Sequence, residues 1–132
     1  MAGSDVDNDL AAELMAGYVV HLCPKRMLGS GGSPTGPAET WVQGFHFFLC
    51  LEAGPKKCRL LPLYSSGNVG REALSTEGRL GHPKWVHGTF HFHPAQTWTA
   101  SRAVIARAAA DADDRSRKGS RNTLAVEFLP NV

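Results

Sequence analysis

The chain has 132 residues and a formal net charge of +2, and 42% of its residues are hydrophobic while 20% are charged. This length suits one domain with its own core, and this composition excludes a wholly disordered chain. No apolar run reaches the roughly 20 residues of a membrane-spanning helix, and the acidic start is unlike a signal peptide. Because Cys23, Cys50 and Cys58 form no CxxC pair, free thiols in a reducing compartment are expected. We therefore expect a cytoplasmic protein without a membrane partner.

The first elements in chain order are an acidic segment, a strand and a long loop. Residues 1–16 form the acidic segment, in which Asp and Asn precede Leu10 and Leu14, so a short helix or an unstructured tail is expected. The stretch GYVVHLC, residues 17–23, predicts a strand. Residues 29–40 are rich in glycine and proline and predict a long loop.

Two longer strands follow and form a predicted hairpin. Apolar and aromatic residues dominate residues 40–52 and 58–65, and the AGPKK between them is typical of a turn. The glycine-containing stretch after them, residues 66–83, is expected to run over the surface as a second loop.

Short strands and one helix complete the predicted order. Residues 84–93 and 96–100 predict two short strands, separated at a proline that cannot donate to a strand ladder. The alanine-rich stretch 102–114, with Ser101 as its N-cap, predicts the one long helix. Residues 123–130 predict a last strand or an extended arm.

This order predicts a mainly β protein of the α+β class, in which residues 17–132 form a single domain. Short strands and glycine-rich loops favour a small, strongly curved barrel or sheet with the C-terminal helix packed on its end. A parallel α/β fold is disfavoured, because the one good helix follows the strands instead of alternating with them.

Histidines gather between residues 82 and 93. In a strand, His91 and His93 share one face. Phe90 and Phe92 share the other face, so we expect the phenylalanines to be buried and the imidazoles to face a cleft or solvent. Three interpretations stay open: surface histidines, a cluster that acts on an anionic substrate, or a metal-dependent enzyme that uses the His82–His93 cluster. The metal interpretation lacks an identified carboxylate partner.

The loop after the second hairpin strand has the composition of a phosphate-binding turn. SSGNVGR, residues 65–71, offers hydroxyls, backbone amides and a guanidinium that suit a phosphate, although a plain turn has the same composition. Trp85 beside Lys84 is a candidate surface on which a base stacks, although a residue of this kind is more often an ordinary core aromatic. Lys25 and Arg26 are further candidates for contacts with a substrate.

The order of parts over about residues 17–66 resembles a known family. GYVVHLC, a long loop, GFHFFLCLE, a hairpin turn and CRLLPLYSS are similar in order to the opening of the MazF/PemK family of toxin ribonucleases, which fold as a small SH3-like barrel. Ser65 falls where the family's strand ends in threonine or serine. QGFHFF occupies the place of the family's R-P-x-L-V, so the family's arginine is missing there, and His46 or Arg71 would have to replace it.

The resemblance implies a small toxin-like endoribonuclease that cleaves single-stranded RNA without a metal or another cofactor. Attack by the RNA's own 2′-hydroxyl needs proton transfer and charge stabilisation, and histidine and arginine suit these roles. The implied partners are RNA, a small acidic antitoxin-like protein and a second copy in a homodimer. An alternative of a different class is a non-catalytic module that binds nucleic acid or a protein. The expected catalytic residues are Ser65, Arg71, His46, His91 and His93, and the expected substrate-binding residues are Lys25, Arg26, Lys84 and Trp85.

Overall fold

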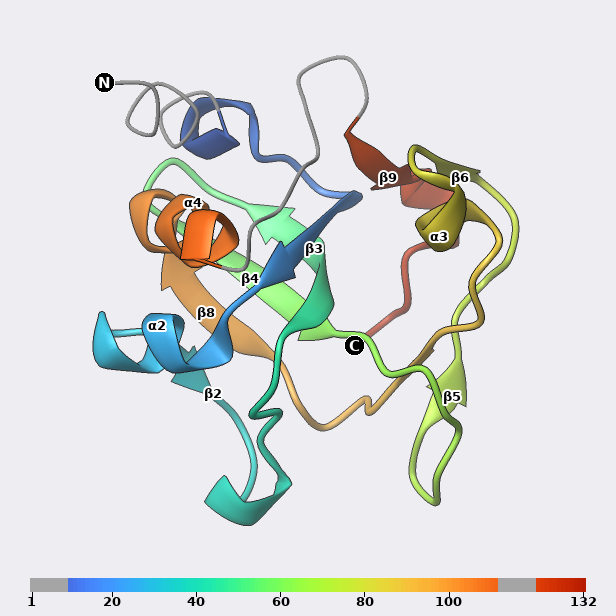
Figure 1. Cartoon of the computed structure of the whole chain (residues 1–132), viewed down its shortest axis with the longest axis horizontal. Helices are drawn as coiled ribbons and strands as arrows, with labels where there is room; N and C mark the ends of the chain where they lie inside the picture. Colours follow the sequence, from blue (N-terminus) through green and yellow to red (C-terminus); the bar gives the residue numbers. More distant parts are fainter. Residues whose placement is uncertain (1–9, 112–120) are drawn as a thin grey trace.

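The computed structural model describes residues 10–111 and 121–132, which form a mainly β fold with a few helices, as the sequence predicts (Figure 1). The main sheet has seven antiparallel strands in the order β2-β8-β4-β3-β1-β9-β6. Its strands are β1 (Tyr18–Leu22), β2 (Ser33–Pro34), β3 (His46–Ala53), β4 (Lys57–Pro62), β6 (Arg79–Leu80), β8 (Trp98–Ser101) and β9 (Asn122–Leu124).

The main sheet is open. Its two ends are β2 and β6, and no strand of the described residues joins them, so the sheet is not closed into the barrel that the sequence favours. Both end strands are two residues long. Such short edges present few unpaired backbone groups to another chain.

The centre of the sheet is the β3–β4 hairpin, which confirms the hairpin predicted at AGPKK. The two strands pair from Phe48 opposite Pro62 to Ala53 opposite Cys58. Side chains alternate between the two faces of a strand, and accordingly Phe48 lies in one buried cluster while Leu49 lies in the other. The sheet therefore has a hydrophobic core on each face.

The first core lies between the sheet and the helices α2 (Pro24–Gly29) and α4 (Arg102–Asp111), which Figure 1 shows next to each other. Ile105 of α4 is fully buried in this cluster. The helix predicted at 102–114 is confirmed for residues 102–111, and residues 112–114 lie outside the described part. Helix α2, which has a proline in its first turn, was not predicted.

The opposite face of the sheet is covered by the chain between β4 and β8 and by the C-terminal segment. Within this chain, β5 (Glu72–Ala73) pairs with β7 (His91–Phe92) in a small second sheet, and α3 (Pro83–Val86) lies between them in sequence. Phe92 of β7 is buried in the second core together with Leu124 of β9. The burial predicted for Phe92 is therefore confirmed.

The segment predicted as a strand at residues 84–93 begins as a helix instead. Pro83 stands in the first turn of α3, and the His82 ring accepts a hydrogen bond from the Lys84 N–H at 3.1 Å. Proline in the first turn and a side chain that caps the free N–H groups are typical of a helix start. The helix turns Trp85 into the second core with 0% exposure.

The remaining segments refine the expectations from the sequence. Residues 10–13 are helical, and residues 1–9 lie outside the described part. The long loop includes a 3-10 turn at Ala38–Thr40, and β9 is followed by a second one at Val126–Phe128. Among the helices of the described residues, none has the length and apolarity needed to span a membrane.

Candidate functional site

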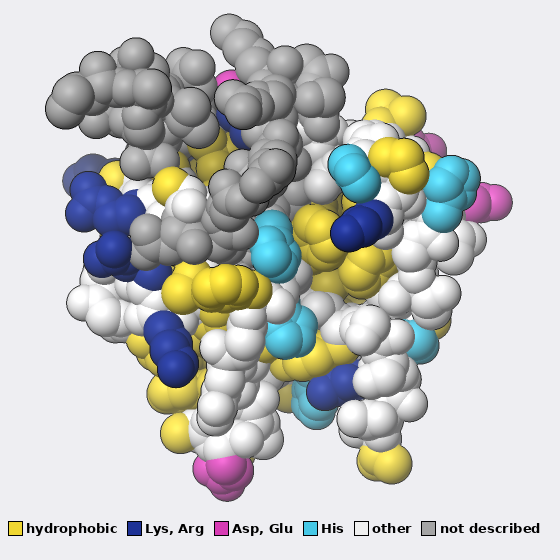
Figure 2. All heavy atoms as spheres, in the orientation of Figure 1, with side chains coloured by type: hydrophobic (Ala, Val, Ile, Leu, Met, Phe, Trp, Pro, Cys, Tyr) yellow, Lys and Arg dark blue, Asp and Glu magenta, His cyan; other side chains and the backbone are white. Residues whose placement is uncertain are grey.

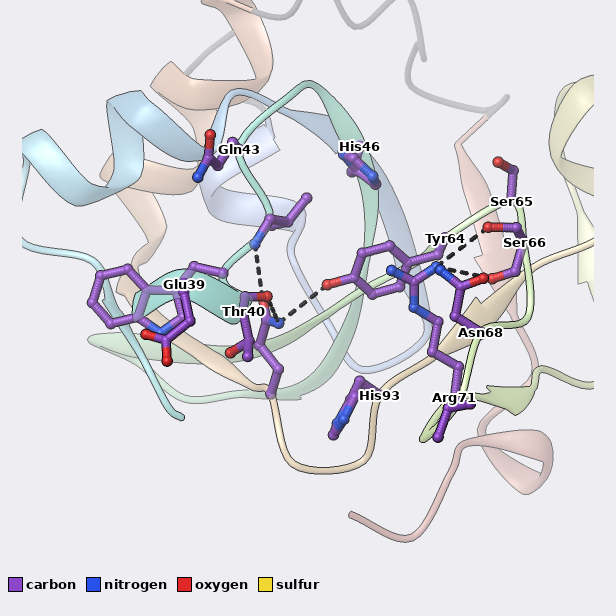
Figure 3. A pocket seen from close by; sticks show the side chains of 14 residues that line it. Glu39, Thr40, Gln43, His46, Tyr64, Ser65, Ser66, Asn68, Arg71 and His93 are labelled. Carbon is purple, nitrogen blue, oxygen red and sulfur yellow. Dashed lines mark hydrogen bonds between the residues drawn. The ribbon is translucent and has the colours of Figure 1, made fainter. Parts of the chain in front are cut away.

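A groove of about 670 Å³ opens where β3 begins and β4 ends (Figure 3). Its walls are residues 39–43, the segment 64–71 after β4, and His93 with Gln96 after β7. This volume lies within the range of about 300–1,000 Å³ that is typical of small-molecule sites. The groove brings together four of the five expected catalytic residues, Ser65, Arg71, His46 and His93.

The Gln96 side chain, which is 3% exposed, ties the walls of the groove together. Its Nε2 donates hydrogen bonds to the Thr40 carbonyl at 2.8 Å and to the Tyr64 hydroxyl at 3.1 Å. Its Oε1 accepts hydrogen bonds from the Val42 N–H at 3.2 Å and from the Trp98 indole N–H at 3.1 Å. A buried amide whose polar atoms are all paired is a rigid connection.

Arg71 is stacked on the Tyr64 ring. Its guanidinium carbon lies 3.7 Å from the ring centre, which is close enough for a cation–π interaction. Its Nη1 donates to the Ser66 carbonyl at 3.0 Å and lies 3.4 Å from the Ser66 hydroxyl oxygen. No carboxylate in the described part of the chain forms an ion pair with Arg71. Its positive charge is therefore available to an anion in the groove.

Tyr64 stays protonated at neutral pH. Burial raises the pKa of its phenol above the ordinary value, and the hydrogen bond from Gln96 and the charge of Arg71 act in the opposite direction. Tyr64 therefore supports the Arg71 guanidinium and accepts a hydrogen bond from Gln96. The imidazoles are the groups of the groove that are suited to proton transfer.

His46 is the first residue of β3, and its ring lies edge-on to Tyr64 with 5.4 Å between the ring centres. Its Nδ1 is 2.8 Å from the Gly44 carbonyl oxygen. Because a carbonyl only accepts hydrogen bonds, Nδ1 carries the proton, and the free lone pair of the neutral ring is on Nε2. His46 therefore has the tautomer of a proton acceptor.

His93 has the opposite arrangement. Its Nδ1 accepts a hydrogen bond from the Ala95 N–H at 3.1 Å, so the proton of the neutral ring is on Nε2. Gly70 approaches so closely that a Cβ there would lie 3.0 Å from this Nε2, and its φ of +87° favours glycine. Figure 3 shows His46 and His93 on opposite sides of the pair formed by Tyr64 and Arg71.

His91, the fifth expected catalytic residue, does not line the groove. It is half-buried, and its Nδ1 is buried without a hydrogen-bond partner. A Cβ at Gly67 would lie 2.8 Å from its Nε2, so the loop covers the ring. Its backbone N–H and carbonyl pair with Tyr64 at 2.7 and 2.8 Å. His91 is therefore not part of the groove, and its backbone positions Tyr64 instead.

The expected substrate-binding residues lie elsewhere. Lys25 and Arg26 are exposed on α2, where Figure 2 shows Lys and Arg side chains gathered over α2 and α4. Lys84 is exposed on α3, outside the groove. Trp85 is fully buried, and its indole N–H donates to the Thr123 carbonyl at 3.0 Å. Trp85 is therefore a core aromatic, which was one of the two interpretations of the sequence, and it offers no surface on which a base could stack.

The histidines between residues 82 and 93 are dispersed. His82 caps α3, and His87 is exposed at the end of that helix. His93 lines the groove, whereas His91 does not. Across residues 10–111 and 121–132, no three His, Cys, Asp or Glu side chains gather as a metal ion requires. The placement of these histidines does not favour the metal-dependent interpretation.

Among the groove residues that the sequence did not single out as site residues, four matter most to its chemistry: Tyr64, Gln96, Glu39 and Trp41. Gln96 carried a signal, because in the strand predicted at residues 96–100 it shares a face with Trp98, and both side chains are buried. A glutamine on a buried face indicates a hydrogen-bond network. Glu39 and Trp41 carried none, since they stand at the end of a loop rich in glycine and proline.

Comparison with known proteins gives no further assignment. The chain matches no protein-family model, no curated protein and no solved structure. The chemistry of the groove is therefore argued from its own residues.

Proposed function

We propose that this protein is a small endoribonuclease that cleaves single-stranded RNA without a metal ion, and that the groove binds the scissile phosphodiester. The observation that carries this proposal is the placement of His46 and His93, with opposite tautomers, in one groove with Arg71. A basic nitrogen, an N–H donor and a positive charge are the groups that attack by a 2′-hydroxyl requires.

His46 acts as the general base of this reaction. Its Nε2 takes the proton of the ribose 2′-hydroxyl, and the 2′-oxygen forms a bond to the neighbouring phosphorus. The bond from phosphorus to the 5′-oxygen breaks, which yields a 2′,3′-cyclic phosphate and a 5′-hydroxyl that takes its proton from water. The Gly44 carbonyl, 2.8 Å from Nδ1, stabilises the imidazolium until it returns its proton to solvent.

Arg71 and His93 stabilise the charge that develops on the phosphate oxygens. Arg71 is held on Tyr64 and by the Ser66 carbonyl before any substrate is present, so little reorganisation is needed. His93 supplies its Nε2–H as a neutral hydrogen-bond donor. The Ser65 hydroxyl, exposed in the same wall, adds a further donor.

The likeness to the MazF/PemK toxins belongs to the same proposal. Ser65 follows β4 and lines the groove, and in this proposal it takes the place of the strand-terminal serine or threonine of that family. Arg71 brings a guanidinium into the groove from the following loop, in place of the arginine that the chain lacks before β3. An SH3-like arrangement of the sheet and regulation by a small acidic antitoxin-like protein are part of this proposal.

The test is cleavage of a single-stranded RNA in the presence of a chelator. The wild type should release a 2′,3′-cyclic phosphate, and an RNA with 2′-deoxyribose at the cleaved position should resist. His46→Ala should lower the rate by about 10² or more, the usual contribution of a general base. His87→Ala is the matched control, because His87 is exposed on α3 outside the groove.

Two results would contradict the proposal. Cleavage of the 2′-deoxy substrate would exclude attack by the 2′-hydroxyl. Tight RNA binding with no cleavage would show a non-catalytic nucleic-acid-binding module instead.

A further inference from the structure

The groove is asymmetric in charge. Arg71, His93 and Ser65 lie at one end, and Glu39 lies at the other, beside Thr40 (Figure 3). Glu39 is the one carboxylate among the described residues that line the groove. A carboxylate repels a phosphate, so this end is unsuited to the RNA backbone and suited to a group that donates hydrogen bonds.

The Glu39 end is held in place by hydrogen bonds of its neighbours. The carbonyl of Thr40 accepts from Gln96, and the Trp41 indole N–H donates to the carbonyls of Thr35 and Gly36 at 3.2 and 3.0 Å. Because its N–H is already paired, the part of Trp41 that is left for a ligand is its apolar ring. Trp41 is half-buried and lines the groove, so part of this ring is accessible.

A carboxylate beside an aromatic ring discriminates between the four RNA bases. A carboxylate has two oxygens that only accept hydrogen bonds, and it fits a base edge with two adjacent donors. The Watson–Crick edge of guanine has such a pair, N1–H and N2–H. Adenine, cytosine and uracil each place at most one donor group there, next to an acceptor that a carboxylate repels.

We propose that the Glu39 end of the groove is a guanine-binding subsite that selects a guanine next to the scissile phosphate. The Glu39 carboxylate accepts from N1–H and N2–H, and the Trp41 ring stacks on the base. Arg71 holds the phosphate at the opposite end. This inference rests on the proposed cleavage of RNA, and it names the nucleotide at which cleavage occurs.

The first experiment measures nucleotide binding by tryptophan fluorescence. Trp85 and Trp98 have 0% exposure, so quenching by a nucleotide reports on Trp41, the third tryptophan of the chain. Guanosine monophosphate should bind about tenfold or more tightly than adenosine monophosphate, which is the discrimination that a good two-bond contact provides. Inosine monophosphate, which lacks the 2-amino group, should fall between them. Ribose 5-phosphate, followed by calorimetry, is the probe for the phosphate end alone.

A substitution at Glu39 separates the two ends of the groove. Glu39→Gln should remove the preference for guanine and leave the affinity for ribose 5-phosphate unchanged, because the phosphate end is intact. Glu39 is exposed, so the variant should fold normally. Glu77→Gln, at an exposed carboxylate outside the groove, is the matched control and should keep the preference.

Mapping the cleavage sites in an RNA that contains all four nucleotides completes the test. Cleavage predominantly beside guanine in the wild type, and spread over other nucleotides in Glu39→Gln, supports the inference. Equal cleavage at all four nucleotides, together with equal binding of the guanine and adenine nucleotides, overturns the guanine subsite and leaves RNA cleavage standing. If no RNA is cleaved, the proposed function fails, and the binding preference alone then decides whether the subsite exists.

Discussion

The guanidinium carbon of Arg71 lies 3.7 Å from the centre of the Tyr64 ring, while the same guanidinium donates to the Ser66 carbonyl at 3.0 Å. These two contacts fix the plane and the orientation of the guanidinium group. A lysine ammonium at this position is a point charge on a flexible stem and does not reproduce the planar stack. The groove therefore depends on arginine in particular and not on positive charge in general.

We expect Arg71→Ala to lower kcat/KM for RNA cleavage by about 10² or more, in line with the loss of a group that stabilises developing charge. Arg71→Lys should recover only part of this loss. Both variants should keep a melting temperature close to that of the wild type, because the side chain is half-exposed. Steady-state kinetics and thermal melting check this, and full activity in the lysine variant would contradict the role of the stack.

The two imidazoles of the groove should respond differently to substitution. Glutamine places an amide N–H close to the position of the histidine Nε2 but cannot act as a base near neutral pH. We therefore expect His93→Gln to keep much of the activity, and His46→Gln to lose about 10² or more, as for removal of a general base. Comparable losses in the two variants would show that the roles assigned from the tautomers are wrong.

Chemical rescue tests the same assignment. If His46 supplies the base, added imidazole should restore part of the rate of His46→Ala, because a free base then takes the place of the missing side chain. The same addition should leave the rate of His87→Ala unchanged, since His87 is exposed outside the groove. A folded His46→Ala variant that imidazole does not rescue would contradict the role of His46 as the base.

Gly70 should be required for two reasons: its backbone has a positive φ, and the absence of a Cβ leaves room for the His93 ring. Gly70 and Gly31 both have positive φ values, +87° and +96°, but a Cβ at Gly31 meets no atom within 4 Å. Each alanine substitution should therefore destabilise the fold by about 1 kcal/mol through backbone strain. Only Gly70→Ala should also lower RNA cleavage, because its Cβ would lie 3.0 Å from the Nε2 of His93. Equal activities of the two variants would contradict this contact.

The sequence predicts the sheet-forming hairpin, the C-terminal helix and four residues of the groove because each has a local cause. AGPKK is a turn by composition, and the alanine-rich stretch has a high helix propensity. His46, Ser65, Arg71 and His93 stand at strand ends or in a loop, where polar groups can be exposed without opening a core. These four residues meet in one groove because of the tertiary structure, and no local sequence pattern indicates that they do so.

The predictions that the structure does not confirm failed for local and for long-range reasons. Trp85 is preceded by His82 and Pro83, which are a start signal for a helix. The strand was predicted instead because the segment is rich in apolar residues. His91 follows the predicted alternation of the strand, but Gly67, distant in sequence, covers its ring. The role of Glu39 depends on the hydrogen bonds of Gln96 across the groove, which the sequence of the loop cannot indicate.

The buried amide of Gln96 should contribute strongly to the free energy of unfolding, because several buried groups depend on it for a hydrogen bond. Gln96→Leu leaves the Val42 N–H, the Trp98 indole N–H and the Thr40 carbonyl without their partner. We expect a loss of about 2 to 5 kcal/mol in the free energy of unfolding, because each buried group without a partner costs about 1 to 3 kcal/mol. Gln43→Leu, an exposed glutamine in the same groove, should change stability by less than about 0.5 kcal/mol. Denaturant unfolding of both variants measures the difference, and similar values would contradict the network.

Both tyrosines of the chain, Tyr18 and Tyr64, should ionise above the ordinary pKa of 10.0 in the folded protein. Burial is the main cause for each, and the carboxylate of Glu13 raises the pKa of Tyr18 further. Since the folded pKa values lie above the unfolded value, this contribution to stability is complete below pH 10.0 and is lost as the pH rises through the folded pKa values. Tyrosinate absorbance in an alkaline titration measures both groups, and Tyr64→Phe assigns them. A folded chain that titrates at the same pH as the chain in denaturant would show that neither phenol is shielded, and Tyr64 could then take part in proton transfer beside Arg71.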